Sequence, residues 1–280
     1  MQLVLQRSVL DLAEPKVMGV LNVTPDSFSD GGRYDQLDAA LARSERMVEE
    51  GAAIVDVGGE STRPGASPVS TEEEIRRVVP VIERLASRMA VPVSVDTSKP
   101  EVMRAAVDAG AQMINDVRAL RMPGALAAAA ASGAAVCLMH MQGEPASMQM
   151  APAYVDVIAD VRGFLDARVV ACLSAGIPRE RICIDPGIGF GKLLDHNLAL
   201  LAGLAGIGEP SLPIVVGVSR KSLVGIITGR PSADRLAGSV AFAALAVARG
   251  ARIVRAHDVA ATVDAVKVAA ALLGALQGDK

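Results

Sequence analysis

The sequence predicts a (β/α)8 barrel that occupies residues 1–280 as a single domain. Eight short apolar runs recur along the chain, helical segments separate them, and nearly every run ends in a polar or charged residue. Strands that are buried on both faces have continuous Val, Ile and Leu runs, and such barrels gather functional groups at the carboxyl ends of their strands. The length of 280 residues is also close to the roughly 250 typical of this fold.

Each expected strand is one of these short runs. In chain order they cover residues 17–22, 53–56, 93–96, 113–116, 135–140, 182–185, 214–219 and 252–257. The longer connections, residues 24–35, 61–70 and 141–152, all follow strand ends. Because the carboxyl ends of parallel strands meet at one rim, we expect the polar ends and these connections to form one shared site.

Helices are expected between the strands. They cover residues 37–50, 71–89, 126–132, 154–174, 196–202, 233–248 and 259–276, and one more begins near Pro100. Ser98, followed by Pro100 and Glu101, is typical of a capped helix start. Thr71 and Glu74 have the spacing of a second capping box. Alternation of strand and helix predicts right-handed crossovers that close a parallel sheet.

Composition and charge exclude several classes of function. The net charge of −3 and the pI near 5.7 do not suggest the basic surface that nucleic-acid binding requires. Residues 122–139 form the longest uncharged run, but proline and glycine interrupt it, so no membrane span is expected. The start of the chain lacks the features of a signal peptide, and its three cysteines have no metal or redox spacing. A cytoplasmic protein with a small-molecule partner is expected.

A glycine-rich segment needs separate interpretation. Gly187, Gly189 and Gly191 are spaced two and two, which does not match the dinucleotide-binding fingerprint, and no phosphate-binding loop with Gly-Lys-Ser/Thr occurs. We interpret these glycines as positions where the backbone approaches a flat ligand closely.

The polar strand ends divide into two groups, of which the first suits a planar heterocycle. It combines acceptors, one amide and a cation: Asp96, Asn115, Asp185 and Lys221. A carboxylate can accept two parallel hydrogen bonds from the amino-pyrimidinone edge of a guanine or a pterin. The alternative is that these aspartates cap the following helices, and Asp56 and Asp116 are expected to do so.

The second group is cationic and suits a phosphate or another anionic leaving group. It consists of Arg63, Arg255 and His257, with Asn22 nearby if the first and last strands are neighbours. Surface salt bridges are the alternative for the two arginines. Asn22 is a candidate ligand for a Mg²⁺ ion that retains most of its waters. His140 and His196 lack paired metal spacing, and core or surface positions are expected for them.

Eight segments at these strand ends also carry a resemblance to a known family. They are residues 19–32, 56–65, 94–97, 114–116, 138–143, 185–192, 219–222 and 255–259. Together they resemble bacterial dihydropteroate synthases, over nearly the whole chain and in the same order. The resemblance implies a transferase of folate biosynthesis that joins 6-hydroxymethyl-7,8-dihydropterin diphosphate to 4-aminobenzoate, giving 7,8-dihydropteroate and diphosphate.

The resemblance also implies roles for individual residues. The pterin-binding positions are Asp96, Asn115, Met139, Asp185, Phe190, Lys221 and Arg255. The diphosphate-binding and catalytic positions are Asn22, Arg63, Arg255 and His257, with Mg²⁺ at Asn22. The aminobenzoate side consists of Phe28, Thr62, Pro64, Ser219 and Lys221. Sulfonamides would compete for the aminobenzoate pocket. A homodimer is implied, although the Ala-rich helices near the C-terminus have the composition either to form its interface or to pack on the barrel.

Two alternatives remain open. A pterin methyltransferase domain of a corrinoid enzyme would share the barrel and the pterin site, but it would not need residues 62–64 or the Arg255 and His257 corner. A catalytically silent pterin-binding paralogue would need no catalytic residues, yet every matched catalytic position is filled in this chain.

Overall fold

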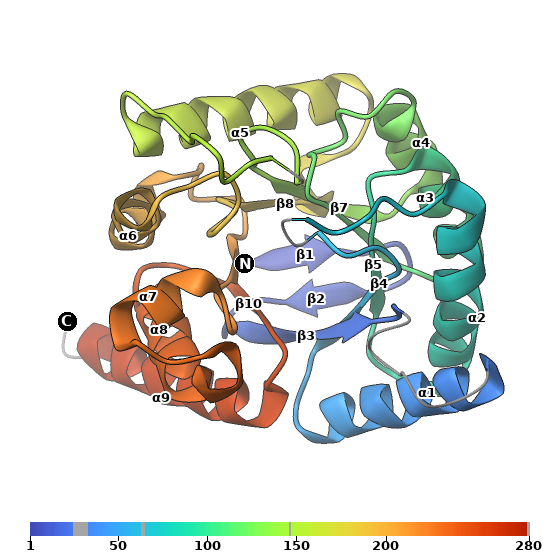
Figure 1. Cartoon of the computed structure of the whole chain (residues 1–280), viewed down its shortest axis with the longest axis horizontal. Coiled ribbons are helices and arrows are strands. Elements are labelled where there is room, and N and C mark those ends of the chain that lie inside the picture. The colour runs from blue at the N-terminus through green and yellow to red at the C-terminus, as the bar shows by residue number, and fades with distance from the viewer. Residues whose placement is uncertain (25–32, 63–64, 146, 279–280) are drawn as a thin grey trace.

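A computed structural model of the chain shows a parallel barrel surrounded by helices (Figure 1). The structure describes residues 1–24, 33–62, 65–145 and 147–278. Hydrogen-bonded neighbours follow the order β8-β7-β6-β5-β4-β3-β10-β9. A parallel bridge between Ile184 and Ile214 joins the two outer strands and closes the ring. The predicted fold class is confirmed.

The barrel strands follow the predicted apolar runs. They are β3 (Lys16–Asn22), β4 (Ile54–Gly58), β5 (Val93–Asp96), β6 (Met113–Asp116), β7 (Ala135–Met139), β8 (Ile182–Asp185), β9 (Val215–Gly217) and β10 (Ile253–Ala256). Nearly all their residues are buried, because side chains fill the barrel on one face and helices cover the other. β9 is shorter than the predicted run because the chain already turns after Val218, whose carbonyl accepts from Lys221 N–H at 3.3 Å.

Helices form the outer layer. They are α1 (Arg33–Glu49), α2 (Thr71–Arg88), α3 (Pro100–Asp108), α4 (Ala125–Ser132), α5 (Val157–Ser174), α6 (Leu194–Ala202), α7 (Ser222–Thr228), α8 (Leu236–Ala248) and α9 (Val259–Gly278). The sequence did not predict α7, which is short and contains glycine and β-branched residues that disfavour helix. Within the described ranges, no helix combines the length and apolar character needed to cross a membrane.

The start of α2 differs by one residue from the prediction. Ser70 is the N-cap, and its side chain accepts from Glu73 N–H at 3.2 Å. Thr71 is the first residue of the helix instead of its cap. The acidic first turn still favours this start, because it faces the positive end of the helix dipole.

The expected cap of α3 was also wrong. Lys99 occupies the N-cap position, and Ser98 instead donates a hydrogen bond from Oγ to Asp116. Asp116 was expected to cap a helix, yet its carboxylate accepts from the N–H groups of Arg118 and Leu120, at 2.8 Å and 2.7 Å. Asp116 therefore organises the turn after β6.

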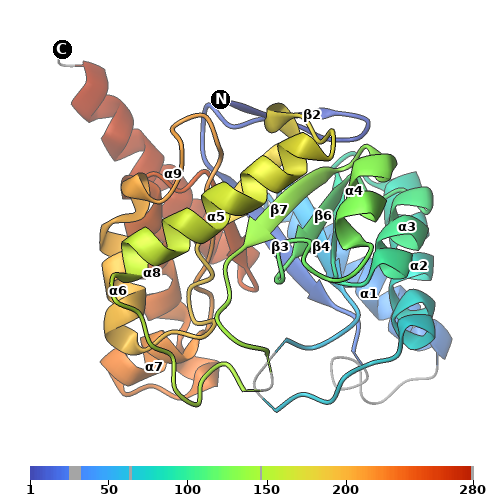
Figure 2. The same ribbon diagram turned by 90° about the horizontal axis from the view of Figure 1, so that it is seen from above.

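An N-terminal hairpin, which the sequence did not predict, closes one end of the barrel. β1 (Gln2–Val4) pairs antiparallel with β2 (Val9–Asp11). Leu3, Leu5 and Leu12 are buried against inward residues of the barrel strands, namely Met18, Ile54, Met113, Ala135, Cys137, Cys183, Val215 and Ile253. Figure 2 shows this hairpin at the end opposite the connections that follow the carboxyl ends of the strands. The other end is therefore the open mouth.

Candidate active site

Four polar side chains from different strands form one hydrogen-bonded network in the mouth. Arg255 on β10 donates from Nε to Asp56 Oδ2 and from Nη2 to Asp96 Oδ2, both at 2.7 Å. Asn115 Nδ2 also donates to Asp56 Oδ2, at 3.0 Å. We call Asp56, Asp96, Asn115 and Arg255 the mouth network. Asp56 was expected to cap a helix, and the structure instead places it at the centre of this network.

The mouth network holds more negative than positive charge. Asp56 is fully buried, and its Oδ1 has no hydrogen-bond partner within the described residues. Burial, opposed by Arg255 and reinforced by Asp56, raises the pKa of Asp96 to about 7. Burial opposes the charge of Arg255, but Asp56 and Asp96 raise its pKa overall. One guanidinium thus serves two carboxylates, which leaves acceptor capacity for a ligand rich in N–H groups.

Buried Asp185 and partly buried Lys221 form a second part of the mouth. Asp185 Oδ1 accepts from Gly187 N–H at 2.7 Å, while Oδ2 has no partner in the described part of the chain. Burial raises the pKa of Asp185, and Lys221 opposes that shift. Burial lowers the pKa of Lys221 to about 8, partly offset by Asp185. Lys221 Nζ lies 4.6 Å from the ring centroid of Phe190, within cation–π range.

A glycine brings the two parts together. A Cβ atom at Gly217, in β9, would lie 3.6 Å from Lys221 Nζ and 3.8 Å from Arg255 Cβ. Lys221 and Arg255 are therefore neighbours across a position that carries no side chain. The division into two separate groups does not hold for Arg255, which connects the cationic group with the acceptors.

Apolar side chains line the mouth beside these groups. Phe190 packs against a buried cluster that consists of Val117, Met139, Met141 and Met148. The structure thus brings together Met139 and Phe190, which the resemblance placed in the pterin pocket. The other members were missed because two of them lie in the connection after β7, where sequence gives no apolar periodicity.

His257 and Ser219 are in contact at the end of β10. Ser219 Oγ lies 3.2 Å from His257 Nδ1 and accepts the His257 backbone N–H at the same distance. Arg220, which lies between Ser219 and Lys221 in the chain, has a φ of 57°. Its Nε donates to Asp258 Oδ2 at 2.8 Å.

Asn22 lies at the rim close to Asp96. Asn22, Gly58 and Asp96 are register partners across β3, β4 and β5. A Cβ atom at Gly58 would lie 3.7 Å from both Asn22 Oδ1 and Asp96 Oδ2, so two oxygen ligands face a space that no side chain fills. The donor chemistry fits Mg²⁺, which prefers oxygen. No group of three or more His, Cys, Asp or Glu residues suited to a metal occurs in the described ranges.

The remaining predicted residues belong to the connections. Thr62 is half-buried in the segment that follows β4. Phe28, Arg63 and Pro64 lie outside the described residues, so their predicted roles are not placed by the structure.

The glycine-rich segment approaches protein backbone more closely than we expected. A Cβ atom at Gly187, where φ is +68°, would lie 1.9 Å from the His140 carbonyl oxygen, and one at Gly191 would lie 2.4 Å from that of Gln142. Only Gly189 faces a side chain of the site, with Lys221 Cδ 3.2 Å from its Cβ position. Two of the three glycines therefore let the connection after β8 pack on the connection after β7.

Lys192 holds these two connections together, a role that was not predicted from the sequence. Its Nζ lies 2.9 Å from His140 Nδ1 and donates to the carbonyls of Gly187 and Phe190, both at 3.0 Å. Burial lowers the pKa of Lys192 to about 7. Burial, reinforced by Lys192, lowers the pKa of His140 to about 3, so this histidine is neutral and accepts the hydrogen bond. A core or surface position was expected for His140, and the structure places it in the core.

A barrel with this mouth is a member of the pterin-binding class: the family model described as pterin binding enzyme matches residues 18–257. The dihydropteroate synthase of Escherichia coli strain K12 is 52% identical over 280 residues, covering 100% of this chain and 99% of that protein. The chain belongs to the dihydropteroate synthase family and is a transferase of folate biosynthesis.

Two solved structures support this assignment. The Yersinia pestis dihydropteroate synthase in complex with a sulfonamide drug is 51% identical, with a TM-score of 0.93 and coverage of 98% of this chain and 100% of that chain. The Burkholderia cenocepacia enzyme complexed with 7,8-dihydropteroate is 49% identical, with a TM-score of 0.90 and coverage of 99% and 98%.

Proposed function

We propose that the mouth joins the amine of 4-aminobenzoate to the methylene carbon of 6-hydroxymethyl-7,8-dihydropterin diphosphate, which gives 7,8-dihydropteroate and diphosphate. One observation carries the substrate assignment: buried Asp185 presents an oxygen that has no hydrogen-bond partner among the described residues, beside Lys221 and Phe190. That arrangement suits a flat heterocycle whose edge donates N–H groups. The dihydropteroate synthase of E. coli matches this chain over 99% of its own length, which supports the same reaction.

The pterin would be held between the two parts of the mouth. Asp185 accepts from one edge of the ring, while Asp96 and Asn115 face another edge from the mouth network. Phe190 and Met139 supply apolar contact with the ring faces. The pocket is largely desolvated, so a mismatched donor or acceptor would cost more here than in water.

The diphosphate would lie toward Asn22, Arg63, Arg255 and His257. Ser219 orients the His257 ring, and Asp56 with Asp96 fixes the Arg255 guanidinium before the substrate arrives. Mg²⁺, when bound at Asn22 with phosphate oxygens and waters, would stabilise the negative charge of the leaving group. Fixed cations contribute to the same stabilisation without reorganising during the reaction.

The aminobenzoate would occupy the side formed by Phe28, Thr62, Pro64, Ser219 and Lys221. In the reaction, the bond from the pterin methylene carbon to the diphosphate oxygen breaks, and the amine nitrogen forms a bond to that carbon. The amine then releases one proton, and no covalent enzyme intermediate is needed. Sulfonamides would compete at this side, as the sulfonamide complex of the Y. pestis relative supports.

A coupled assay of diphosphate release tests the proposal. Release should require both substrates and should fall when Mg²⁺ is chelated. Asp185→Asn should reduce it, whereas Asp195→Asn, an exposed change in α6, should not. Binding of a pterin analogue without any diphosphate release would instead identify a silent pterin-binding paralogue. Transfer of a methyl group from a methylated pterin would favour the corrinoid-linked alternative.

We further propose that the chain forms a cytoplasmic homodimer through α7, α8 and α9. These neighbouring helices expose large apolar side chains, namely Ile226, Ile227, Leu236, Leu245, Val268 and Leu272. The three cysteines are free and buried, as suits a reducing compartment. Sedimentation analysis should give a dimer, and Leu245→Glu should shift it to monomer. A wild-type monomer, or a dimer that tolerates this change, would contradict the interface.

A further inference from the structure

Several described residues of the segment between β4 and α2 are exposed. It carries Thr62, which the proposed function assigns to the aminobenzoate side. Gly65 is exposed, and a Cβ atom placed there would have no heavy atom within 4 Å. Ser67 and Pro68 are also exposed. Hydrogen bonds hold the described residues at the two ends of this segment.

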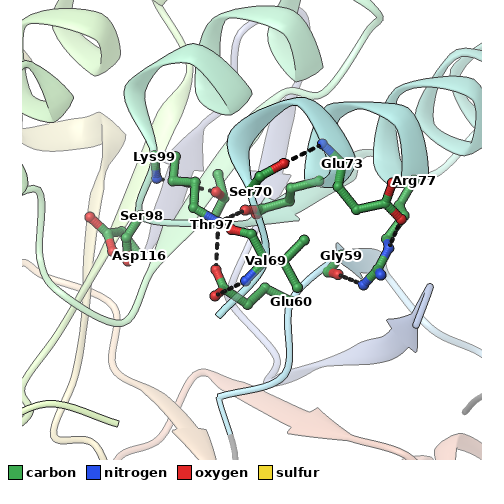
Figure 3. Close-up of polar contacts among 11 residues, drawn as sticks. Gly59, Glu60, Val69, Ser70, Glu73, Arg77, Thr97, Ser98, Lys99 and Asp116 are labelled. Atoms are coloured by element: carbon green, nitrogen blue, oxygen red, sulfur yellow. Dashed lines mark hydrogen bonds and ion pairs between the residues drawn. The ribbon is translucent and has the colours of Figure 1, made fainter. Parts of the chain in front are cut away.

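Two hydrogen bonds between a side chain and a backbone group hold those ends in place (Figure 3). Val69 N–H donates to Glu60 Oε1 at 3.0 Å, which connects positions nine residues apart. Arg77 Nη1 donates to the Gly59 carbonyl at 2.9 Å and so attaches the first end to α2. We call Gly59, Glu60 and Val69 the loop base.

Lys99 binds the loop base from a different element. It lies at the N-cap of α3, three residues after the end of β5, and its Nζ donates to three acceptors. These are Glu60 Oε2 at 2.7 Å, the Val69 carbonyl at 2.7 Å and Glu74 Oε2 at 2.6 Å. All three ammonium protons are thereby directed, so the side chain has a single favoured position.

The charge of Lys99 compensates a buried carboxylate. Glu74 is fully buried, and in the described part of the chain Lys99 is its only side-chain hydrogen-bond partner. Burial opposes the charge of Lys99, but its hydrogen bonds to Glu60 and Glu74 raise its pKa overall. The lysine thus stays charged at neutral pH.

The backbone next to Lys99 leads directly to the pterin side of the mouth. Lys99 N–H donates to Thr97 Oγ1 at 3.2 Å, and Thr97 N–H donates to the Asn115 carbonyl at 3.1 Å. Asp96, which precedes Thr97, and Asn115 both belong to the mouth network. A short, fully bonded path therefore connects the mouth network with the loop base.

We propose that Lys99 is a positioning residue that fixes residues 59–62 and 65–70 relative to the pterin-binding residues, and so sets the position of Thr62 on the aminobenzoate side of the site. Lys99 acts through Glu60 and Val69 without touching either substrate. The inference rests on the proposed function, because that function gives the segment its role.

Two variants break the loop base in different ways. Glu60→Ala removes the acceptor of Val69 N–H and one partner of Lys99, while Lys99 stays paired with Glu74. Lys99→Met combined with Glu74→Gln removes the lysine without leaving a buried carboxylate unpaired. Each should raise the KM for aminobenzoate about tenfold, with kcat and the Kd of a pterin analogue changed less than about threefold. Lys99→Arg should keep the KM for aminobenzoate close to that of wild type, since arginine can donate to the same acceptors.

Arg168→Met provides a matched control. Arg168 is another partly buried cation that donates to a backbone carbonyl, that of Ala119, at 2.8 Å, but it holds the turn after β6. Its loss should leave the KM for aminobenzoate within about twofold of wild type. An unchanged KM in both loop-base variants, or an equal rise in Arg168→Met, would overturn the positioning role.

Calorimetry separates this inference from the proposed function. Aminobenzoate is titrated into the enzyme with diphosphate and Mg²⁺ present, so no turnover is required. Weaker binding by Glu60→Ala than by wild type and Arg168→Met supports the inference, whatever the assay of diphosphate release shows. Equal affinity in all three proteins contradicts it, even when wild type is an active synthase.

Discussion

The guanidinium of Arg255 lies 2.7 Å from Oδ2 of Asp56, although the two residues are 199 positions apart in the chain. β10 and β4 flank β3 in the closed barrel, so this pair spans the first strand of the ring. Asp56 is fully buried. The pair therefore links β10, the last strand of the barrel, to β4, the second. Each of the two charges is stabilised by the other.

Arg255→Met should destabilise the fold by about 3–5 kcal/mol, because it leaves the carboxylates of Asp56 and Asp96 buried without their cation. Urea unfolding at pH 7 measures the loss. Arg252→Met is the control from the same region, since Arg252 makes one exposed contact, with the Ala13 carbonyl at 3.3 Å, and should change stability by less than about 0.5 kcal/mol. Similar losses in both variants would show that Asp56 and Asp96 do not need Arg255.

Asp185→Asn should weaken binding of a pterin analogue by about 2–5 kcal/mol, because an amide nitrogen would then face a ligand N–H donor in a desolvated pocket. Isothermal titration calorimetry tests this, with Asp195→Asn as the exposed control. A Kd within about threefold of wild type would exclude Asp185 from pterin recognition.

Gly187→Ala should cost about 1–3 kcal/mol more stability than Gly229→Ala. The two glycines have nearly equal φ values, +68° and +69°, so both variants carry the same backbone strain. A Cβ atom at Gly187 would lie 1.9 Å from the His140 carbonyl oxygen, whereas one at Gly229 would have open space. Chemical denaturation of both variants measures the difference, and equal losses would mean that the connection after β7 yields easily.

His140 should make the fold sensitive to acid. Burial, together with Lys192, lowers its pKa from 6.5 to about 3. Between these values the unfolded chain binds a proton that the folded protein excludes, so stability present above pH 6.5 is lost as the pH falls. Wild type should therefore lose about 2 kcal/mol more than His140→Gln between pH 7.5 and pH 5, since glutamine still accepts from Lys192 but does not titrate. Parallel losses in urea unfolding would show that another group controls the acid response.

The features that could be predicted best from the sequence are those that a local pattern of residues determines. Apolar runs that end in a polar residue located Asp96, Asn115 and Asp185 at the mouth, because strand burial and strand direction are local properties. The pairing of Arg255 with Asp56 could not be predicted, since it depends on the closure of the ring between distant strands.

Lys192 and the N-terminal hairpin illustrate a different limit. A lysine after a glycine-rich turn usually faces solvent, and only the packing of two connections buries this one. β1 and β2 contain three residues each, too few for a strand pattern to stand out. Their leucines are ordered by the barrel floor and not by their own sequence.

That floor has a consequence for synthesis on the ribosome. Leu3, Leu5 and Leu12 are translated before the barrel strands, but they pack against residues from β3 through β10, including Ile253. These leucines therefore cannot be buried until β10 has been made. Closure of the barrel floor therefore depends on β10, and nascent chains that stall before β10 would expose these leucines to chaperones and proteases.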